Sequence, residues 1–383
     1  MGSYFLSHLH ALGGGVVAYL VPFLFVLSLV VFVHELGHFL IARLCGVRIL
    51  VFSIGFGPEL IGFYDRHRTR WKISAIPLGG YVKFFGDENA GSVPDTARLE
   101  TMSEGERVQS FFFQPVLKRA AIVVAGPLAN FALAIAVFAV IFMIYGKQTM
   151  SARVDAVQAG SPAAAAGFAP GDVVVAINGQ AINSFTDMQR IVSDAAGDTL
   201  KIQVDRKGAP IVLTATPELK EVKDNFGNVH RIGILGITRS MAADELKFQP
   251  VAPPQAVWLG VQETWFVIDR TLSYIGGVIV GREAADQLGG PIRIAQISGE
   301  VATIGFVALI HLAAVLSVSI GLLNLFPIPL LDGGHLLFYS IEAIRGRPLS
   351  ERAQEVGFRI GLAIVVMLMI FATFNDIVHL TTS

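Results

Sequence analysis

The chain has 383 residues, of which 53% are hydrophobic and only 15% are charged, and its mean hydropathy is +0.60. Soluble domains carry about a quarter charged residues, so this composition indicates a membrane protein. The 29 basic and 30 acidic residues nearly balance, which argues against nucleic acid as a partner. The single cysteine, Cys45, cannot form an internal disulfide.

Four stretches are expected to cross a membrane, where about 20 apolar residues suffice. They are Ala11–Val33, Ala120–Gly146, Thr303–Leu331 and, with a snorkelling Arg359 at its edge, Ile360–Phe374. No small-residue cleavage site follows the first stretch, so we expect it to be retained rather than removed as a signal peptide.

A fifth apolar stretch, Trp258–Gly281, carries charges near its middle, namely Glu263, Asp269 and Arg270. Charges are costly inside a bilayer, and the apolar residues here recur at three- and four-residue steps. We therefore expect an amphipathic helix at the membrane surface, with its tryptophans at headgroup level.

Basic residues predict the topology, because cytoplasmic loops of membrane proteins are enriched in Lys and Arg. Two loops are basic. The loop between the first two spans contains Arg43, Arg48, Arg66, Arg68, Arg70, Lys72, Lys83, Lys118 and Arg119. The loop between the last two spans contains Arg345, Arg347 and Arg352. Both loops are therefore expected to be cytoplasmic. Both termini and segment 147–306 are expected to lie on the other side.

That outer segment begins with a pattern that predicts a small α+β domain at about 150–240. Strands are expected at Arg153–Val157, Val173–Ile177, Leu200–Arg206 and Ile211–Thr216, with turns at Asn178-Gly179 and Lys207-Gly208 and a helix that starts near Thr186. This order, with Gly-Phe-Ala-Pro-Gly-Asp before the second strand, resembles a bacterial PDZ domain. Such domains bind extended peptides at a sheet edge, whereas a β-rich spacer is the simpler alternative.

The loop between the first two spans contains short, glycine-bounded strand patterns. Gly55-Phe56-Gly57-Pro58 comes first, then the alternating Trp71–Ala75, then Gly79-Gly80-Tyr81. We predict a β-hairpin, either re-entrant beside the active site or lying in the cytoplasm. Gly79, Gly80 and Tyr81 are candidate substrate-binding residues, because an edge strand from 71–83 could pair with an unwound substrate.

The first span leads directly into His34-Glu35-Leu36-Gly37-His38. Two histidines four residues apart lie on one face of a helix, so His34 and His38 can share one zinc ion. Glu35 could take a proton from a water at that metal, because zinc lowers the pKa of such a water toward 7. A polar helix end is the plainer interpretation, but it does not explain two histidines and a carboxylate beside a long uncharged stretch.

A catalytic zinc site needs a third protein ligand, and Asp332 is the candidate. It follows an uncharged span and lies between Pro327 and Pro329 on one side and Gly333-Gly334 on the other, where the backbone can turn sharply. From the residues alone, a solvated aspartate in a helix-terminating turn is about equally plausible. His335, three residues further on, is the competing ligand.

Taken together, these segments resemble the site-2 protease family of intramembrane zinc metalloproteases. More specifically, they resemble its bacterial RseP-type branch (regulator of sigma-E protease), which cleaves anti-sigma factors and signal-peptide remnants. The resemblance extends through Ala125-Gly126-Pro127 and Phe374-Asn375-Asp376. It implies zinc ligands at His34, His38 and Asp332, a catalytic base at Glu35 and a substrate-backbone contact at Asn324. The best-known members carry two tandem PDZ domains, whereas this chain has room for one.

The expected fold is a multi-pass α-helical membrane protein with about four transmembrane helices and an inserted α+β PDZ-like domain. Its expected parts are 1–149 with the first two spans, 150–240, the interfacial segment 241–302, and 303–383 with the last two spans. The resemblance implies one zinc ion per chain and a place in the bacterial inner membrane. The PDZ-like domain would then be periplasmic and the zinc site would lie toward the cytoplasm.

The expected partners are the lipid bilayer and single-span membrane proteins of the anti-sigma factor type. Two other functions fit a membrane zinc site. One is a metallohydrolase that acts on a lipid or a lipidated protein, which would not need a PDZ-like module. The other is a zinc-dependent chaperone or transporter, which would keep its function without Glu35.

Overall fold

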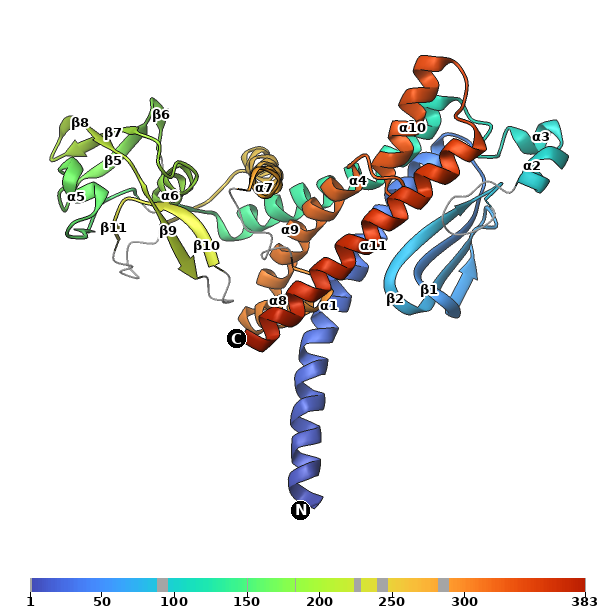
Figure 1. Ribbon diagram of the computed structural model, residues 1–383, viewed down its shortest axis with the longest axis horizontal. Coiled ribbons are helices and arrows are strands. Elements are labelled where there is room, and N and C mark those ends of the chain that lie inside the picture. Colours follow the sequence, from blue (N-terminus) through green and yellow to red (C-terminus); the bar gives the residue numbers. More distant parts are fainter. Residues whose placement is uncertain are drawn as a thin grey trace. The chain divides into compact units, whose positions relative to one another are not determined.

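The computed structural model describes residues 2–87, 96–149, 151–182, 184–223, 229–239, 247–281 and 289–382. The chain forms two compact units (Figure 1). One unit contains the N-terminal segment through Val140, Val257–Val280 and the C-terminal segment from Leu288. The other contains Ile141–Ala256 and Gly281–Gln287. The unit with the long helices carries the candidate site.

Among the described residues, four helices are long and apolar enough to cross a membrane. They are α1 (Gly2–Leu44), α4 (Val116–Tyr145), α9 (Phe306–Asn324) and α11 (Glu351–Thr382). The predicted number of spans is confirmed. The third span is shorter than the predicted Thr303–Leu331, since its helix covers Phe306–Asn324. The first span continues to Leu44, however, and does not stop at Val33 as predicted. The prediction ended it at the first ionisable side chain, whereas the helix carries Glu35 and both histidines within its apolar length.

A two-stranded hairpin lies beside α1, formed by β1 (Ile49–Tyr64) and β2 (Arg70–Phe84) (Figure 1). Both strands are longer than the short strands predicted from the sequence, and they bend. Val51 consequently pairs with Arg70 on one side and with Lys83 on the other. The first part of β1 therefore lies between the two ends of β2, and 80–84 forms an outer strand.

Aromatic packing and one carboxylate attach this hairpin to α1. The rings of Phe39 on α1, Phe52 on β1 and Trp71 on β2 contact one another, with centroids 4.3–5.5 Å apart. Asp65, in the turn between the strands, accepts hydrogen bonds from Arg43 at 2.6 Å and from the Trp71 indole at 3.3 Å. Hydrogen bonds to the ionised carboxylate hold the pKa of Asp65 well below its usual range, despite partial burial.

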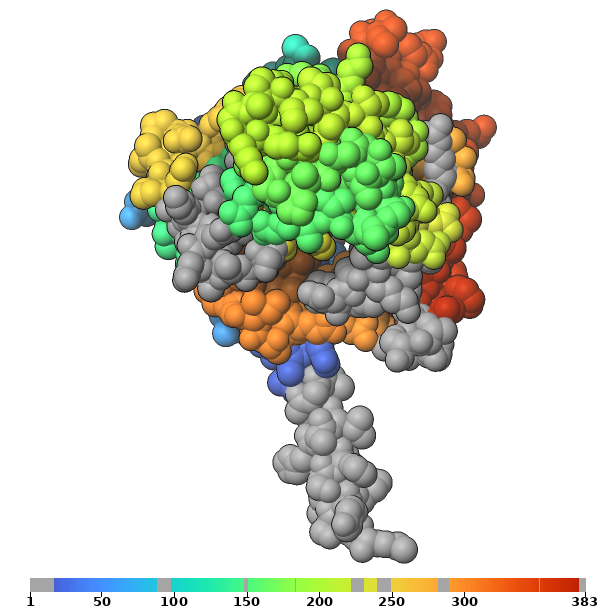
Figure 2. Space-filling view, turned by 90° about the vertical axis from the view of Figure 1, so that its left-hand side faces the viewer, coloured from blue at the N-terminus to red at the C-terminus, as the bar shows by residue number. Residues whose placement is uncertain are grey.

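The inserted domain is built on a four-stranded sheet with the order β6-β5-β7-β8. Its strands are β5 (Val173–Ile177), β6 (Gln180–Ala181), β7 (Leu200–Arg206) and β8 (Ala209–Ala215), and its helices are α5 (Pro162–Ala166) and α6 (Phe185–Asp194). Strands β5, β7 and β8 and helix α6 match their predictions closely, because alternating apolar residues and positive-φ turns at Asn178-Gly179 and Lys207-Gly208 define them locally. Of the predicted strand Arg153–Val157, only Ala156–Val157 forms a strand. The domain is the green to yellow-green body that faces the viewer in Figure 2.

Short strand pairs complete the inserted unit. They are β3 (Lys147–Thr149) with β12 (Lys247–Gln249), β4 (Ala156–Val157) with β11 (Ile237–Thr238), and β9 (Glu218–Lys223) with β10 (Val229–Ile234). Asp172 is fully buried in this domain and accepts two hydrogen bonds from the Arg206 guanidinium, at 2.7 and 2.8 Å. These bonds lower the pKa of the Asp172 carboxyl. The predicted fold class, a multi-pass helical membrane protein with an inserted α+β domain, is confirmed.

The remaining helices are α2 (Thr96–Thr101), α3 (Glu104–Arg107), α7 (Pro253–Val280), α8 (Pro291–Ile304) and α10 (Asp332–Arg345). The predicted amphipathic helix is α7, which is not among the candidate spans found in the described residues. Its Gly260 packs on α4, where an added Cβ would lie 2.6 Å from the carbonyl oxygen of Ile135. Its location at the membrane surface stays a prediction.

The end of α11 is attached to the start of α8. The buried carboxylate of Asp376 accepts backbone N–H bonds from Gly290, Ile292 and Arg293, at 2.7–3.2 Å. A carboxylate is well placed at a helix N-terminus, because the first backbone N–H groups there lack partners within the helix. This contact fixes α11 to α8, which itself packs on α1.

Candidate metal centre

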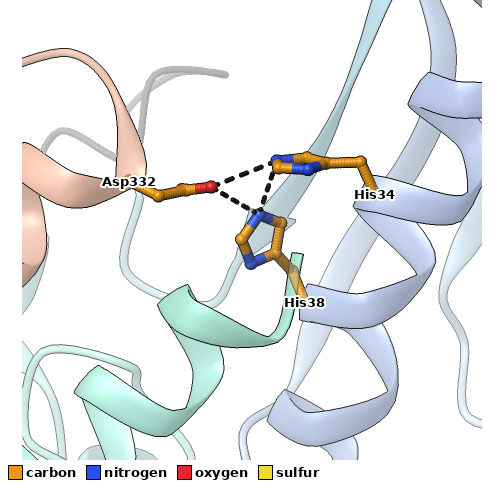
Figure 3. A group of neighbouring side chains, drawn as sticks. All are labelled: His34, His38 and Asp332. Carbon is orange, nitrogen blue, oxygen red and sulfur yellow. Dashed lines mark hydrogen bonds and ion pairs between the residues drawn. The ribbon is translucent and has the colours of Figure 1, made fainter. Parts of the chain in front are cut away.

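Three side chains converge from two elements that are distant in the sequence. His34 and His38 project from adjacent turns of α1, and Asp332, the first residue of α10, points at them from the opposite side (Figure 3). The Nε2 atoms of the two imidazoles are 3.2 Å apart. Oδ2 of Asp332 lies 3.1 Å from Nε2 of His34 and 3.5 Å from Nε2 of His38.

These distances fit zinc. Protein ligands bind zinc tetrahedrally at about 2.0–2.2 Å, which separates two ligand atoms by about 3.3 Å. Oδ2 of Asp332 is buried and has no hydrogen-bond donor among the described residues. Two imidazole nitrogens and a carboxylate oxygen facing one another at this spacing suit a shared metal cation. Among the described residues, these three form the group that could hold a metal.

The tautomer of His38 is set by the backbone of α4. Nδ1 of His38 lies 2.9 Å from the carbonyl oxygen of Ile122. A carbonyl oxygen can only accept, so Nδ1 carries a proton, and in the neutral ring Nε2 then keeps its lone pair. Metal-ligating histidines usually donate their other ring N–H in this way, which fixes the ring and makes it a better ligand.

The side chain of Asn130 on α4 sets the tautomer of His34. Asn130 is fully buried, and its side-chain amide lies 3.3 Å from Nδ1 of His34. With the NH₂ group toward the ring, the amide oxygen is buried without a hydrogen-bond partner in the described part of the chain. A flip of the amide lets that oxygen accept the Nδ1 proton and leaves Nε2 of His34 free for a metal. The orphaned oxygen therefore favours the flipped orientation.

Two glycines allow α1 and α4 to come close enough for these contacts. A Cβ added to Gly126 would lie 2.3 Å from Nε2 of His38, and one added to Gly37 would lie 2.3 Å from the carbonyl oxygen of Ala125. Any side chain at either position would therefore separate the helices or displace the imidazoles. Gly126 belongs to the Ala-Gly-Pro motif noted in the sequence, which thus has a steric role.

Asp332 is positioned by the loop that joins α9 to α10. A Cβ on Gly333 would lie 2.2 Å from the carbonyl oxygen of Phe326, and one on Gly334 would lie 2.5 Å from that of Ile328. The loop therefore folds tightly against the first turn of α10. Leu330 adopts a positive φ of 92° within it. This turn aims the Asp332 carboxylate at α1.

The other candidate site residues are distributed around the cluster. Glu35 lies within electrostatic reach of both histidines and Asp332, and its carboxylate approaches the backbone N–H of Val82. Gly80 is the nearest of the hairpin candidates, since an added Cβ would lie 3.1 Å from Cγ of Glu35. Tyr81, by contrast, packs within the hairpin, where its ring stacks on Phe56 at 6.0 Å.

Gly79 and Asn324 differ in their surroundings. Gly79 has a φ of +143°, and an added Cβ would lie 2.5 Å from the Phe56 ring, so this glycine shapes the hairpin. Asn324 ends α9, is partly exposed, and forms no side-chain hydrogen bond with any residue that the structure describes. Its amide is therefore available to a ligand.

Comparisons with known proteins identify a family and several similar proteins. A family model described as Peptidase family M50 matches residues 22–368. The chain belongs to this peptidase family. It is 54% identical over 364 residues to a predicted zinc metalloprotease of Agrobacterium fabrum, covering 95% of this chain and 97% of that protein. It is also 44% identical over 385 residues to Metalloprotease MmpA of Caulobacter vibrioides, covering 95% of this chain and 96% of that protein.

Among solved structures, the PDZ domain of the SdrC-like protein from Listeria monocytogenes is similar to part of the chain. The match covers 24% of this chain and 87% of that chain, at 22% identity and a TM-score of 0.19.

Family membership confirms the predicted resemblance to site-2 proteases, the predicted enzyme class and the predicted cofactor. The M50 chain is a membrane zinc metalloprotease. Sequence reasoning missed Asn130, although a polar side chain inside the apolar stretch Ala120–Gly146 was a usable signal. It could not find the carbonyl oxygen of Ile122, because every residue has one.

Proposed function

We propose that this M50 metalloprotease cleaves single-span membrane proteins within their transmembrane segments, with His34, His38 and Asp332 as zinc ligands and Glu35 as the base. The convergence of the two imidazoles and the buried carboxylate oxygen carries the proposal. These side chains lie on a membrane-spanning helix and at the start of a helix that follows another span. Substrates of the anti-sigma factor type fit such a site, since a single membrane span places peptide bonds at the depth of the bilayer.

The residues of the chain divide the chemistry between them. Zinc held by the three ligands supplies Lewis acidity, which makes water acidic enough to act as a nucleophile near neutral pH. Glu35 takes the proton of the attacking water and then donates a proton to the leaving amine. The Ile122 carbonyl and Asn130 hold the two imidazoles in the orientation that ligation needs.

A substrate helix must unwind before its peptide bond can be attacked, because its amides are otherwise hydrogen-bonded. The outer strand 80–84 lies next to Glu35, and its edge could pair with an unwound substrate segment. The uncommitted amide of Asn324 could hold the substrate backbone from the side of α9. Both contacts would place the scissile carbonyl next to Glu35.

The surface of the hairpin favours its insertion into the membrane. Away from the turn at Asp65, it exposes mostly large apolar side chains: Phe56, Leu60, Ile61, Phe63, Ile73, Ile76 and Leu78. An apolar surface of this kind is unfavourable in water and suits lipid or an apolar substrate helix. The pairing of β1 with β2 satisfies much of the backbone, as a bilayer requires. We infer that the hairpin is re-entrant, with the basic loops in the cytoplasm and the inserted domain in the periplasm.

Cleavage of a purified single-span substrate tests the proposal. We expect the full chain in detergent to cut this substrate within its apolar segment. Cleavage should stop after treatment with a zinc chelator and resume when zinc is restored. Mass spectrometry of the products locates the cut. Products cut only outside the apolar segment, or cleavage that survives removal of zinc, would contradict the proposal.

Removal of the inserted domain tests whether this domain selects substrates. Thr149 and Lys247 are paired neighbours in the β3–β12 ladder, so a short glycine-rich turn can replace 151–245. We expect the shortened enzyme to bind zinc as before and to cleave substrates with bulky outer domains several-fold faster relative to short ones. A zinc-loaded, folded variant that fails to cleave even a minimal single-span peptide would show that the domain has a different role.

A further inference from the structure

A pocket of about 410 Å³ lies at the C-terminal end of α1, outside the metal centre. It is lined by Arg43, Gly46, Val47, Arg48, Ile49, His67, Arg68, Thr69 and Gln109. Its volume is within the roughly 300–1,000 Å³ range of small-molecule sites. The pocket therefore has room for a polar headgroup or a small anion.

Every charged residue in this lining is basic. The charge of Arg43 is already paired, since its guanidinium donates hydrogen bonds to the Asp65 carboxylate and the Thr69 hydroxyl. The Arg48 guanidinium lies 5.2 Å from the centre of the Phe85 ring. It also interacts electrostatically with the exposed carboxylate of Glu106. Arg68 is exposed and forms no side-chain hydrogen bond or ion pair with the residues that the structure describes. The pocket thus holds more positive charge than its neighbours neutralise.

The negative end of the α1 dipole would oppose an anion here, but the helix end is capped. The carbonyl oxygens of Ile41, Ala42 and Arg43 accept N–H bonds from Cys45, Val47 and Gly46, at 2.9–3.1 Å. Lys118 donates to the carbonyl oxygen of Cys45 at 3.4 Å. These bonds occupy the carbonyl oxygens, so the arginines dominate the local field.

The position of the pocket points to the membrane. The candidate span of α1 ends at Leu44, two residues before Gly46. Leu40 and Leu44, one helical turn apart, are 50% and 81% exposed and offer an apolar surface on the helix whose C-terminal end lines the pocket. Tyr64 at the end of β1 does not line the pocket, but it is 67% exposed and directly precedes the turn that carries His67 and Arg68. Exposed aromatics beside basic residues are typical of the headgroup level.

We propose that this pocket binds the phosphate headgroup of an anionic phospholipid, with Arg48 and Arg68 as its cationic contacts and the acyl chains along Leu40 and Leu44. Arginine suits this role because its planar guanidinium can donate two parallel hydrogen bonds to a phosphate. Basic pockets at the cytoplasmic ends of membrane helices are known to bind such headgroups. The bound lipid would also contact the Asp65 turn, which fastens the hairpin to the helix of the metal centre.

Native mass spectrometry of the full chain in detergent tests the proposal with phosphatidylglycerol and phosphatidylcholine as probes. We expect phosphatidylglycerol to bind preferentially, and Arg48→Gln and Arg68→Gln each to lower its affinity about fivefold. Arg66→Gln is the matched control, because this exposed arginine lies on the same turn and does not line the pocket. Arg68→Lys, which keeps the charge, should retain most of the binding.

Several outcomes would overturn the proposal. Equal binding of both lipids, or an equal loss in the Arg66→Gln variant, would show that only diffuse surface charge is involved. Inorganic phosphate that binds the wild type as tightly as the lipid would make a free anion the ligand. An acidic peptide that binds with the same arginine dependence, while the lipid does not, would identify a protein partner. The zinc content of each variant reports whether the site and fold are intact.

Discussion

Replacement of Glu35 by Gln is expected to abolish cleavage while zinc stays bound near one ion per chain. The amide keeps the shape of the carboxylate but cannot take up a proton at neutral pH, so the general base is lost and the three proposed ligands remain. General bases contribute about 10²–10⁴-fold to rate. The variant should therefore lose at least about 100-fold in cleavage rate with little change in metal content. Product formation and zinc in the purified variant measure the two effects separately.

A matched variant controls for the loss of one negative charge. Glu104 is exposed on α3 and is not among the side chains around the metal centre, so Glu104→Gln should cleave at the wild-type rate. If the Glu35→Gln variant retains near-normal turnover of a good substrate, another group is the base. If it loses zinc instead, Glu35 supports the metal rather than the water. Because the Glu35→Gln variant should bind substrates without cleaving them, single-span proteins that copurify with it can be identified as candidate substrates.

Local sequence patterns predicted those parts of the structure that depend on neighbouring residues. The four-residue spacing of His34 and His38 put both rings on one helix face, and β7 and β8 follow from alternation around Lys207-Gly208. Such features need no knowledge of what packs against them. They include the four spanning helices, the main strands of the inserted domain and two of the three proposed metal ligands.

Contacts between distant segments could not be read in this way. The double pairing of Val51 arises because β2 bends back around β1, which no short window reveals. The roles of Asn130 and the Ile122 carbonyl exist only because Gly37 and Gly126 let α1 and α4 come close. From the residues alone, a role for Asp332 as a metal ligand was about as plausible as a role as a solvated aspartate in a turn. Its assignment as a ligand required the family resemblance, because Asp332 lies 294 positions after His38 in the sequence.

The geometry favours Asp332 over His335 as the proposed third ligand. His335 lies on the same helix as Asp332, but its ring packs against Phe358 at 5.5 Å and Tyr339 at 6.4 Å. Tyr339 is in turn covered by the Arg119 guanidinium, which also binds Glu342 at 2.5 Å and ties α10 to α4. This packing orients α10 so that Asp332 faces the two imidazoles while His335 faces α11.

Asp332→Ala is therefore expected to remove zinc and activity together, whereas His335→Ala should retain the metal. Loss of a residue that only supports a ligand weakens metal binding about 10–100-fold, and loss of a ligand should exceed that. His335→Ala deletes a packed ring, so it should lower the thermal stability but leave zinc near stoichiometric. Zinc content and affinity, measured on both purified variants beside the wild type, decide between the two residues. Zinc that is lost from the His335→Ala variant and retained by the Asp332→Ala variant would reverse the assignment.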